Sequence, residues 1–252
     1  MTVKIVIPAR YASSRLPGKP LLNLAGKPLV LHVVDRCIEA GMSVKNIFIA
    51  TDDIRIVESL SSARVAVVMT SALHRSGTDR INEVAKRERW PDNTVVLNVQ
   101  GDEPLIPSDL IQKVAIFASE RDDFDISTAV VPILSQSDFH NVNVVKAIIG
   151  RRNRALYFTR SAAPLNRDSN DDLRLAKRHI GIYAYRVGAL KQFCTNGEDC
   201  LEAYEKLEQL RALSIGMSIG AIEYDGLVPH GIDTIDDFES VIKLVNEKDC
   251  NA

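Results

Sequence analysis

Short runs of valine and isoleucine alternate with helix-length amphipathic segments along the first half of the chain, and this alternation constrains the fold most strongly. The runs at Val3–Pro8, Asn46–Thr51, Val65–Thr70 and Thr94–Val99 are apolar at nearly every position. Continuous apolar runs of this length are typical of strands that are buried on both faces of a parallel sheet. Strand–helix alternation therefore predicts βαβ units with right-handed crossovers.

Helices are expected between these runs. Apolar residues recur at helical spacing from Leu29 to Ile38, and Gly41 follows as a stop signal. Pro107-Ser108-Asp109 resembles a helix start, with apolar residues at helical spacing after it. A further helix is expected over Leu201–Arg211, with Glu208 and Gln209 facing solvent in the absence of other information.

The second half is richer in predicted strands, at Ile126–Ile133, Val144–Ile149, His179–Tyr185 and Ile219–Tyr224. The polar stretch Asn166–Arg174 between them is expected to be an exposed loop. The predicted fold class is α/β, with a mostly parallel central sheet flanked by helices and a smaller β-rich portion in the second half. We expect one domain over residues 1–252, with a first half at about 1–125 and the β-rich portion at about 126–225.

Charge and cysteine content exclude several classes of protein. The 252 residues carry a formal net charge of -2, so no basic field indicates nucleic acid or an anionic membrane as a partner. The four cysteines lack metal-ligand spacing and are expected to be reduced thiols. No apolar stretch reaches the ~18 residues that a transmembrane helix needs. We therefore expect a cytoplasmic protein.

Polar residues collect where the predicted strands end. Arg10 follows the first run, Asp52 the second, Ser71 the third and Asp102 the fourth. Ligands of open α/β sheets bind at the carboxyl edge of the strands. A ligand site is therefore predicted at this edge.

The loop after the first strand, Pro8–Pro20, contains three cations: Arg10, Arg15 and Lys19. Guanidinium and ammonium groups this closely spaced can bind phosphate oxygens. The loop matches neither the GxxxxGK[ST] nor the GxGxxG pattern, so it is not one of those nucleotide motifs. A solvated basic loop is the alternative interpretation.

Two aspartates lie one or two residues after a glycine. Asp102 follows Gly101, and Asp233 follows Gly231 at a distance of two residues. Mg²⁺ binds a few protein oxygens and otherwise keeps water and phosphate oxygens, so this pair predicts a magnesium site. Turn formation by Asp102 and a place near a helix N-terminus for Asp233 are the alternatives. Downstream of Ser76, Thr78 or Asp79 is expected to cap a helix.

Taken together, the chain resembles the 3-deoxy-D-manno-octulosonate (Kdo) cytidylyltransferases, or CMP-Kdo synthetases, over nearly its whole length. The resemblance is carried, in family order, by Ile7–Leu21, Ser76–Arg80, Asn98–Pro104, Ala155–Arg160, His179–Tyr183, Leu207–Arg211 and Gly231–Thr234. It implies a nucleotide-diphospho-sugar transferase fold, a homodimer, CTP and Kdo as substrates, and a place in lipopolysaccharide synthesis.

The resemblance also implies roles for individual residues. Arg10, Arg15 and Lys19 would hold the triphosphate, and Asp102 and Asp233 would hold Mg²⁺; these five form the expected catalytic set. Nucleotide recognition would further use Ala9, Ser76, Gly77 and Arg80. The sugar pocket would be lined by Gln100, Arg160, His179, Tyr183, Glu208 and Gln209.

Three segments depart from the family pattern, at Ala163–Leu165, Val142–Lys146 and Val228–His230. These departures leave open a related acidic sugar, such as 8-amino-Kdo or a sialic-acid-like ulosonate. A catalytically silent nucleotide-binding regulator is the alternative from another class of protein. The presence of both Asp102 and Asp233 favours the enzyme.

Overall fold

The computed structural model describes residues 3–12, 16–74 and 76–249. The chain divides into two compact units, each taken by itself below. Unit 1 consists mainly of Pro91–Val96 and Lys113–Gly226, and unit 2 of Val3–Trp90, Leu97–Gln112 and Leu227–Ala252. The C-terminal segment thus belongs with the N-terminal half, and Pro91–Val96 belongs with the second half.

Unit 2 is built on a parallel sheet whose strands were all predicted. β1 (Val3–Pro8) pairs in parallel with β4 (Ile47–Thr51), and β4 with β5 (Ala66–Met69). The order is β6-β1-β4-β5, where Leu97 and Asn98 of β6 (Val95–Asn98) belong to this unit. β1, β4 and β6 are buried as expected, whereas β5 is only partly buried because it is the last strand in the order.

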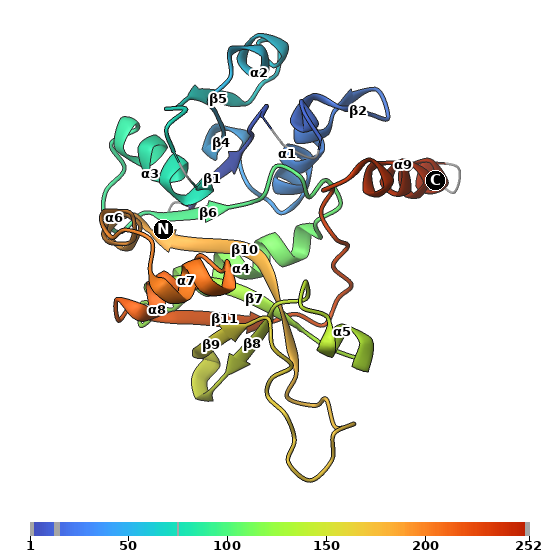
Figure 1. Cartoon of the computed structure of the whole chain (residues 1–252). Coiled ribbons are helices and arrows are strands. Elements are labelled where there is room, and N and C mark those ends of the chain that lie inside the picture. Colours follow the sequence, from blue (N-terminus) through green and yellow to red (C-terminus); the bar gives the residue numbers. More distant parts are fainter. Residues whose placement is uncertain (1–2, 13–15, 75, 250–252) are drawn as a thin grey trace. The chain divides into compact units, whose positions relative to one another are not determined.

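Helices cover the sheet of unit 2, as Figure 1 shows around β1, β4 and β5. The predicted helix at Leu29–Ile38 is confirmed, and Gly41 follows it with φ 84°. The elements are α1 (Leu29–Glu39), α2 (Ile54–Ser59), α3 (Gly77–Arg87), α9 (Ile235–Asp249), η1 (Lys19–Leu21), η2 (Val44–Asn46), and a hairpin of β2 (Asn23–Leu24) and β3 (Lys27–Pro28).

The start of α3 corrects one prediction. The N-cap is Ser76 rather than Thr78 or Asp79, and its Oγ accepts the backbone N–H of Asp79 at 3.1 Å. Ser76 has extended backbone angles (φ -126°, ψ 165°), which an N-cap residue requires, whereas Asp79 lies in the first turn, where its charge favours the helix N-terminus.

Unit 1 is organised around β7 (Ile126–Pro132). β10 (Lys177–Arg186) pairs with it antiparallel, with a register shift between Ile180 and Tyr183, and β11 (Ile219–Glu223) pairs with it in parallel. β8 (Lys146–Ile149) pairs antiparallel with β9 (Ala155–Thr159). β9 was not among the predicted strands, and its apolar Leu156 is exposed.

The prediction of one continuous helix over Leu201–Arg211 is wrong. The structure has two short helices, because Lys206 takes a left-handed conformation (φ 55°, ψ 46°) that ends the first. The helices of this half are α4 (Ser108–Glu120), which begins in unit 2, α5 (Gln136–His140), α6 (Val187–Thr195), α7 (Cys200–Glu205), α8 (Gln209–Ser214) and η3 (Arg151–Asn153). Within the described ranges, no helix is long and apolar enough to cross a membrane.

Candidate active site

A pocket of about 340 Å³ lies in unit 2, at the carboxyl end of β1 and just beyond β6. This is the sheet edge at which the sequence predicts a ligand. The pocket is lined by Pro8, Ala9, Arg10, Ala12, Lys19, Pro20, Gly77, Gln100, Gly101, Asp102 and Asp233. Seven of the predicted site residues therefore meet here, from four separate segments of the chain.

Gly101 allows the loop after β6 to run close to the end of β1. A Cβ at this position would lie 2.6 Å from the carbonyl oxygen of Pro8, a distance that no side chain can occupy. The glycine thereby brings Asp102 into the pocket beside the first loop. This is the close backbone approach for which only glycine is suited.

The ammonium of Lys19 joins the two predicted metal ligands. It lies 2.7 Å from Oδ2 of Asp102 and 3.5 Å from Oδ1 of Asp233, and it donates to the carbonyl of Ile232 at 2.6 Å. A lysine ammonium has three protons, and these three acceptors account for all of them. Lys19 thus neutralises charge that would otherwise make the two carboxylates repel each other.

Asp233 is held at the pocket by the segment that leads into α9. Ile232 is fully buried in a cluster with Leu16, Leu24, Leu29, Phe238 and Val241, and its N–H donates to the carbonyl of Asp102 at 2.9 Å. Oδ2 of Asp237 accepts the N–H groups of Asp233 and Thr234, at 3.0 and 2.8 Å. These hydrogen bonds hold the pKa of Asp237 below its ordinary value. Asp233 therefore precedes a helix, and no strand leads directly into it.

The residues predicted for nucleotide recognition divide into three groups. Ala9, Arg10 and Gly77 line the pocket, whereas Ser76 caps α3. The side chain of Arg80 is fully buried and does not line the pocket. Arg15 lies outside the described residues, so its role remains a prediction.

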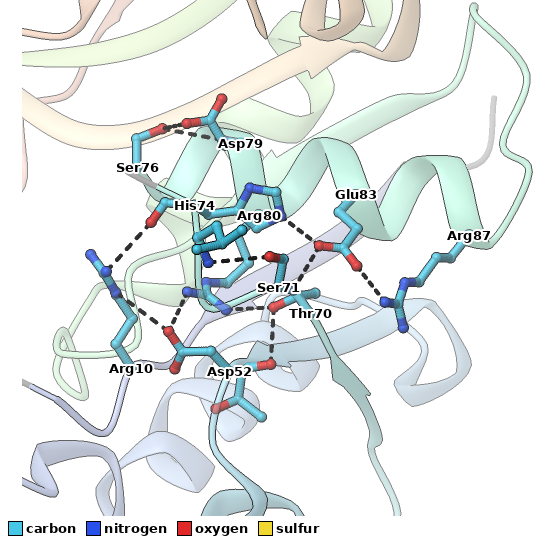
Figure 2. A network of polar contacts seen from close by, with 12 residues as sticks. Arg10, Asp52, Thr70, Ser71, His74, Ser76, Asp79, Arg80, Glu83 and Arg87 are labelled. Atoms are coloured by element: carbon cyan, nitrogen blue, oxygen red, sulfur yellow. Dashed lines mark hydrogen bonds and ion pairs between the residues drawn. The ribbon is translucent and has the colours of Figure 1, made fainter.

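Figure 2 shows the polar network that surrounds Arg80. Its guanidinium donates to Oδ2 of Asp52 at 2.7 Å and to the hydroxyl of Thr70. The Thr70 hydroxyl donates to the carbonyl of Thr51 at 2.9 Å. Asp52 and Thr70 had no assigned role in the sequence, although their places at the ends of β4 and β5 indicated this sheet edge.

Unit 1 brings together four of the six residues predicted for the sugar. The ring centroids of His179 and Tyr183 lie 5.3 Å apart. Besides the larger effect of lost hydration, Glu208 and Tyr185 both interact electrostatically with the hydroxyl of Tyr183 and raise its pKa. Loss of hydration raises the pKa of Tyr183 well above its ordinary value and lowers that of His179 to about 3. His179 is consequently neutral at pH 7, and its Nε2 lies 3.1 Å from Oγ1 of Thr128. Gln209, next to Glu208, is buried rather than facing solvent.

Arg160 fixes the segment from which Glu208 and Gln209 extend. Its guanidinium donates to the carbonyls of Glu205 at 2.6 Å, Val142 at 2.9 Å and Lys206 at 3.4 Å. The Glu205 carboxylate in turn accepts the N–H of Arg160 at 2.7 Å. Sequence reasoning missed Glu205, since nothing in its surroundings distinguishes it from a solvent-facing helix residue. Gln100, the remaining predicted sugar residue, lies in the pocket of unit 2.

Comparison with known proteins places this arrangement in a family. A family model described as cytidylyltransferase matches residues 4–219. The chain is 42% identical over 247 residues to 3-deoxy-manno-octulosonate cytidylyltransferase 2 of Paraburkholderia phytofirmans, covering 97% of this chain and 94% of that one. It is 44% identical over 253 residues to the 3-deoxy-manno-octulosonate cytidylyltransferase of Cellvibrio japonicus, covering 97% and 98%. The chain belongs to the 3-deoxy-manno-octulosonate cytidylyltransferase family.

Solved structures agree with this family. The structure of a CMP:2-keto-3-deoxy-manno-octonic acid synthetase complexed with CTP matches with a TM-score of 0.90 and 35% identity, over 98% of this chain and 100% of that one. A cytidylyltransferase from Leptospira borgpetersenii matches with a TM-score of 0.64 at 18% identity, over 98% and 87%, which shows the fold alone. The expected fold class is confirmed, and the chain is a nucleotidyltransferase of the cytidylyltransferase family.

Proposed function

We propose that this chain transfers CMP from CTP to Kdo, forming CMP-Kdo and releasing pyrophosphate. The observation that carries the proposal is the unit 2 pocket, in which Lys19 joins Asp102 and Asp233 beside Arg10. Cations and carboxylates in one pocket suit a nucleoside triphosphate with its metal ion. The names of the relatives at 42–44% identity support CTP and Kdo as the substrates.

The cations of the pocket provide for the triphosphate. Arg10 is about half exposed, so its guanidinium is free to contact a bound phosphate group. Lys19 is held more tightly, with only 12% of its side chain exposed. Arg10 would donate to the phosphate oxygens, and Lys19 would add its positive charge beside them from its place next to Asp102 and Asp233.

Asp102 and Asp233 fit a magnesium ion. Both carboxylates lie within reach of one cation, Lys19 Nζ, at 2.7 and 3.5 Å, and both line the pocket. The described residues contain no group of three or more metal-ligating side chains, and Mg²⁺ suits a site with few protein ligands because phosphate oxygens and water complete its shell. When bound, the ion would supply positive charge at the reacting phosphate and the leaving pyrophosphate.

The residues of unit 1 would bind the sugar. Tyr183, Glu208 and Gln209 offer hydroxyl, carboxylate and amide groups to the hydroxyls of an acidic sugar. His179 is neutral, so it would contribute a hydrogen bond and not a positive charge to the sugar carboxylate. Gln100, which the resemblance also assigns to the sugar, lines the pocket of unit 2.

The reaction is an in-line displacement at phosphorus. The anomeric hydroxyl of the sugar forms a bond to the α-phosphorus, the bond to the bridging oxygen of pyrophosphate breaks, and the hydroxyl proton passes to solvent. Arg10 stabilises charge on the phosphate oxygens, and the pocket aligns the two reactants. Alignment of this kind is worth up to ~10⁵–10⁸ M in effective concentration, so no covalent enzyme intermediate is required.

We extend the proposal to a cytoplasmic homodimer that supplies CMP-Kdo for lipopolysaccharide synthesis.

Pyrophosphate release with a panel of substrates tests the proposal. CTP, UTP, ATP and GTP are each combined with Kdo, 8-amino-Kdo and a sialic acid, with and without Mg²⁺. The expected result is turnover with CTP and Kdo that depends on Mg²⁺, with ATP and GTP inactive because a site that pairs a pyrimidine edge has no room for a purine. Preference for another acidic sugar would correct the substrate. No turnover with any pair, together with intact CTP binding, would identify a regulator.

A further inference from the structure

We infer that Asp52 is a positioning residue for nucleotide binding, which holds the guanidinium of Arg10 at the pocket by anchoring it to the buried Arg80. The inference rests on the proposed function, because it takes Arg10 as a group that contacts the triphosphate. Asp52 lies at the end of β4 and does not line the pocket itself.

The anchor is the pair between Asp52 and Arg80. The side chain of Arg80 is 0% exposed and that of Asp52 is 13% exposed, with 2.7 Å between Oδ2 of Asp52 and the Arg80 guanidinium. Arginine stays charged in proteins, so a buried guanidinium needs a counter-ion. Among the described residues, Asp52 is the carboxylate that pairs with it. Its oxygen is therefore held in one place.

The same oxygen faces Arg10. Oδ2 of Asp52 lies 3.9 Å from Nε of Arg10, and another nitrogen of Arg10 donates to the carbonyl of His74 at 3.5 Å (Figure 2). Arg10 is 47% exposed, so these two contacts orient an otherwise mobile side chain. Asp52 thus lies between two arginines, one buried and one at the pocket.

The His74 carbonyl, which is the second contact of Arg10, lies in a loop that Glu83 holds in place. Glu83 on α3 accepts the N–H of Ser71 at 2.8 Å and contacts the ring of His74. Although burial by itself raises the pKa of Glu83, the hydrogen bonds from Ser71 and His74 bring it below its ordinary value, so the carboxylate stays ionised. The loop that carries the His74 carbonyl is thereby tied to the same helix as Arg80.

A loss of positioning and a simple charge effect would change the CTP affinity of an Asp52 variant in opposite directions. Removing the negative charge of Asp52 makes the neighbourhood of the pocket more positive, and a simple field effect would tighten binding of the CTP anion. Loss of positioning acts in the opposite direction, because Arg10 would face the uncompensated charge of Arg80 and move away. Weaker CTP binding in Asp52→Asn would therefore report positioning.

Asp53→Asn is the matched control. Asp53 is the next residue, and its carboxylate also pairs with an arginine, Arg55, at 2.6 Å. It caps α2, and asparagine caps helices equally well. The variant makes the same charge change on the same loop without touching Arg10 or Arg80.

Isothermal titration calorimetry of CTP with the 252-residue chain measures the effect. Asp52→Asn should weaken CTP binding about tenfold, the scale of losing one hydrogen bond between Arg10 and a charged phosphate group. In steady-state assays, the KM of this variant for the sugar should be unchanged. Asp53→Asn should stay within about twofold of wild type, as expected for an exposed pair. In an Arg10→Met background, Asp52→Asn should have little further effect, because Asp52 acts through Arg10.

Asp52→Glu covers the case in which Asp52→Asn does not fold. It keeps the counter-ion of Arg80 but displaces the carboxylate by one methylene, so CTP binding should weaken while Tm stays near wild type. Unchanged CTP affinity in the folded Asp52 variants would overturn the inference, as would additive effects of Asp52→Asn and Arg10→Met. If the wild-type chain itself binds no CTP, the proposed function fails instead.

Discussion

Lys19 and Asp102 form a short ion pair, with 2.7 Å between Nζ and Oδ2, in a pocket where a metal ion was expected between two carboxylates. Two carboxylates in one pocket raise each other's pKa unless a positive charge lies between them. The chain supplies that charge itself, from Lys19, which lies 83 positions from Asp102 and 214 from Asp233 in the sequence. Lys19 therefore acts as a counter-ion for both carboxylates.

Replacing Lys19 with methionine should lower the stability of the metal-free protein. The carboxylates of Asp102 and Asp233 would lose their shared counter-ion at a cost of about 1–3 kcal/mol, equivalent to a Tm lower by ~2–12 °C. Mg²⁺ should restore part of this loss, because it can take the place of the ammonium. Differential scanning calorimetry with EDTA and with increasing Mg²⁺ measures both effects.

Lys27→Met is the control for this experiment. Lys27 pairs with Asp35 at the surface, where both side chains are about one-third or more exposed. An exposed pair contributes about 0–1 kcal/mol, so Tm should change little and should not respond to Mg²⁺. An equal effect of both variants would contradict the role of Lys19 as counter-ion.

Asp102→Asn and Asp233→Asn should each lower kcat by ~10²-fold or more, the scale of losing one preorganised electrostatic group. The double variant should be little worse than the worse single one, because the two carboxylates act as a unit. Since Lys19 already relieves their repulsion, Tm should stay near wild type rather than rise. Steady-state assays at saturating CTP and sugar, with Mg²⁺ titrated, give the result. Full activity with an unchanged Mg²⁺ dependence would remove that aspartate from the site.

Arg160→Ala should raise the KM for the sugar far more than the KM for CTP. The variant frees the carbonyls of Glu205 and Lys206, which the guanidinium holds, so Glu208 and Gln209 would lose their position. Arg160→Lys should recover only part of the loss, because an ammonium cannot reproduce the planar fork. Separate KM values for the two substrates decide the matter. A rise confined to CTP would assign Arg160 to the nucleotide instead.

His179 should make the protein less stable in acid. Its pKa is about 3 in the folded chain against an ordinary 6.5, so only the unfolded chain takes up a proton between these values. The stability from the neutral ring is fully present above pH 6.5 and is lost progressively as the pH falls toward 3. Replacing His179 with glutamine should reduce the loss of stability between pH 7 and 4.5 by about 2–3 kcal/mol. Urea unfolding at both pH values measures this, and equal losses in both proteins would show that His179 is not responsible.

Sequence patterns predicted the elements whose signal is local. β1 agrees residue for residue, α1 matches its predicted bounds to within one residue, and α4 begins at its predicted start. Each has a long apolar pattern of one period with a stop or start residue beside it, so no distant contact was needed to decide it. The prediction failed at Lys206, where a left-handed residue divides one apparent helix into two. The carbonyls of Glu205 and of Lys206 itself accept hydrogen bonds from Arg160, a contact between residues 45 or more positions apart.

The composition of the site was likewise present in the sequence, whereas its charge arrangement was not. Basic residues after the first strand and carboxylates beside glycines indicated a triphosphate and a metal ion, because cations suit phosphate oxygens and carboxylates suit Mg²⁺. Only tertiary structure decided that Lys19 neutralises Asp102 and Asp233, that Arg80 is buried, and that Asp52 lies between Arg80 and Arg10. Charges interact through distance in space, and residues 28 to 214 positions apart become neighbours only when the chain is folded.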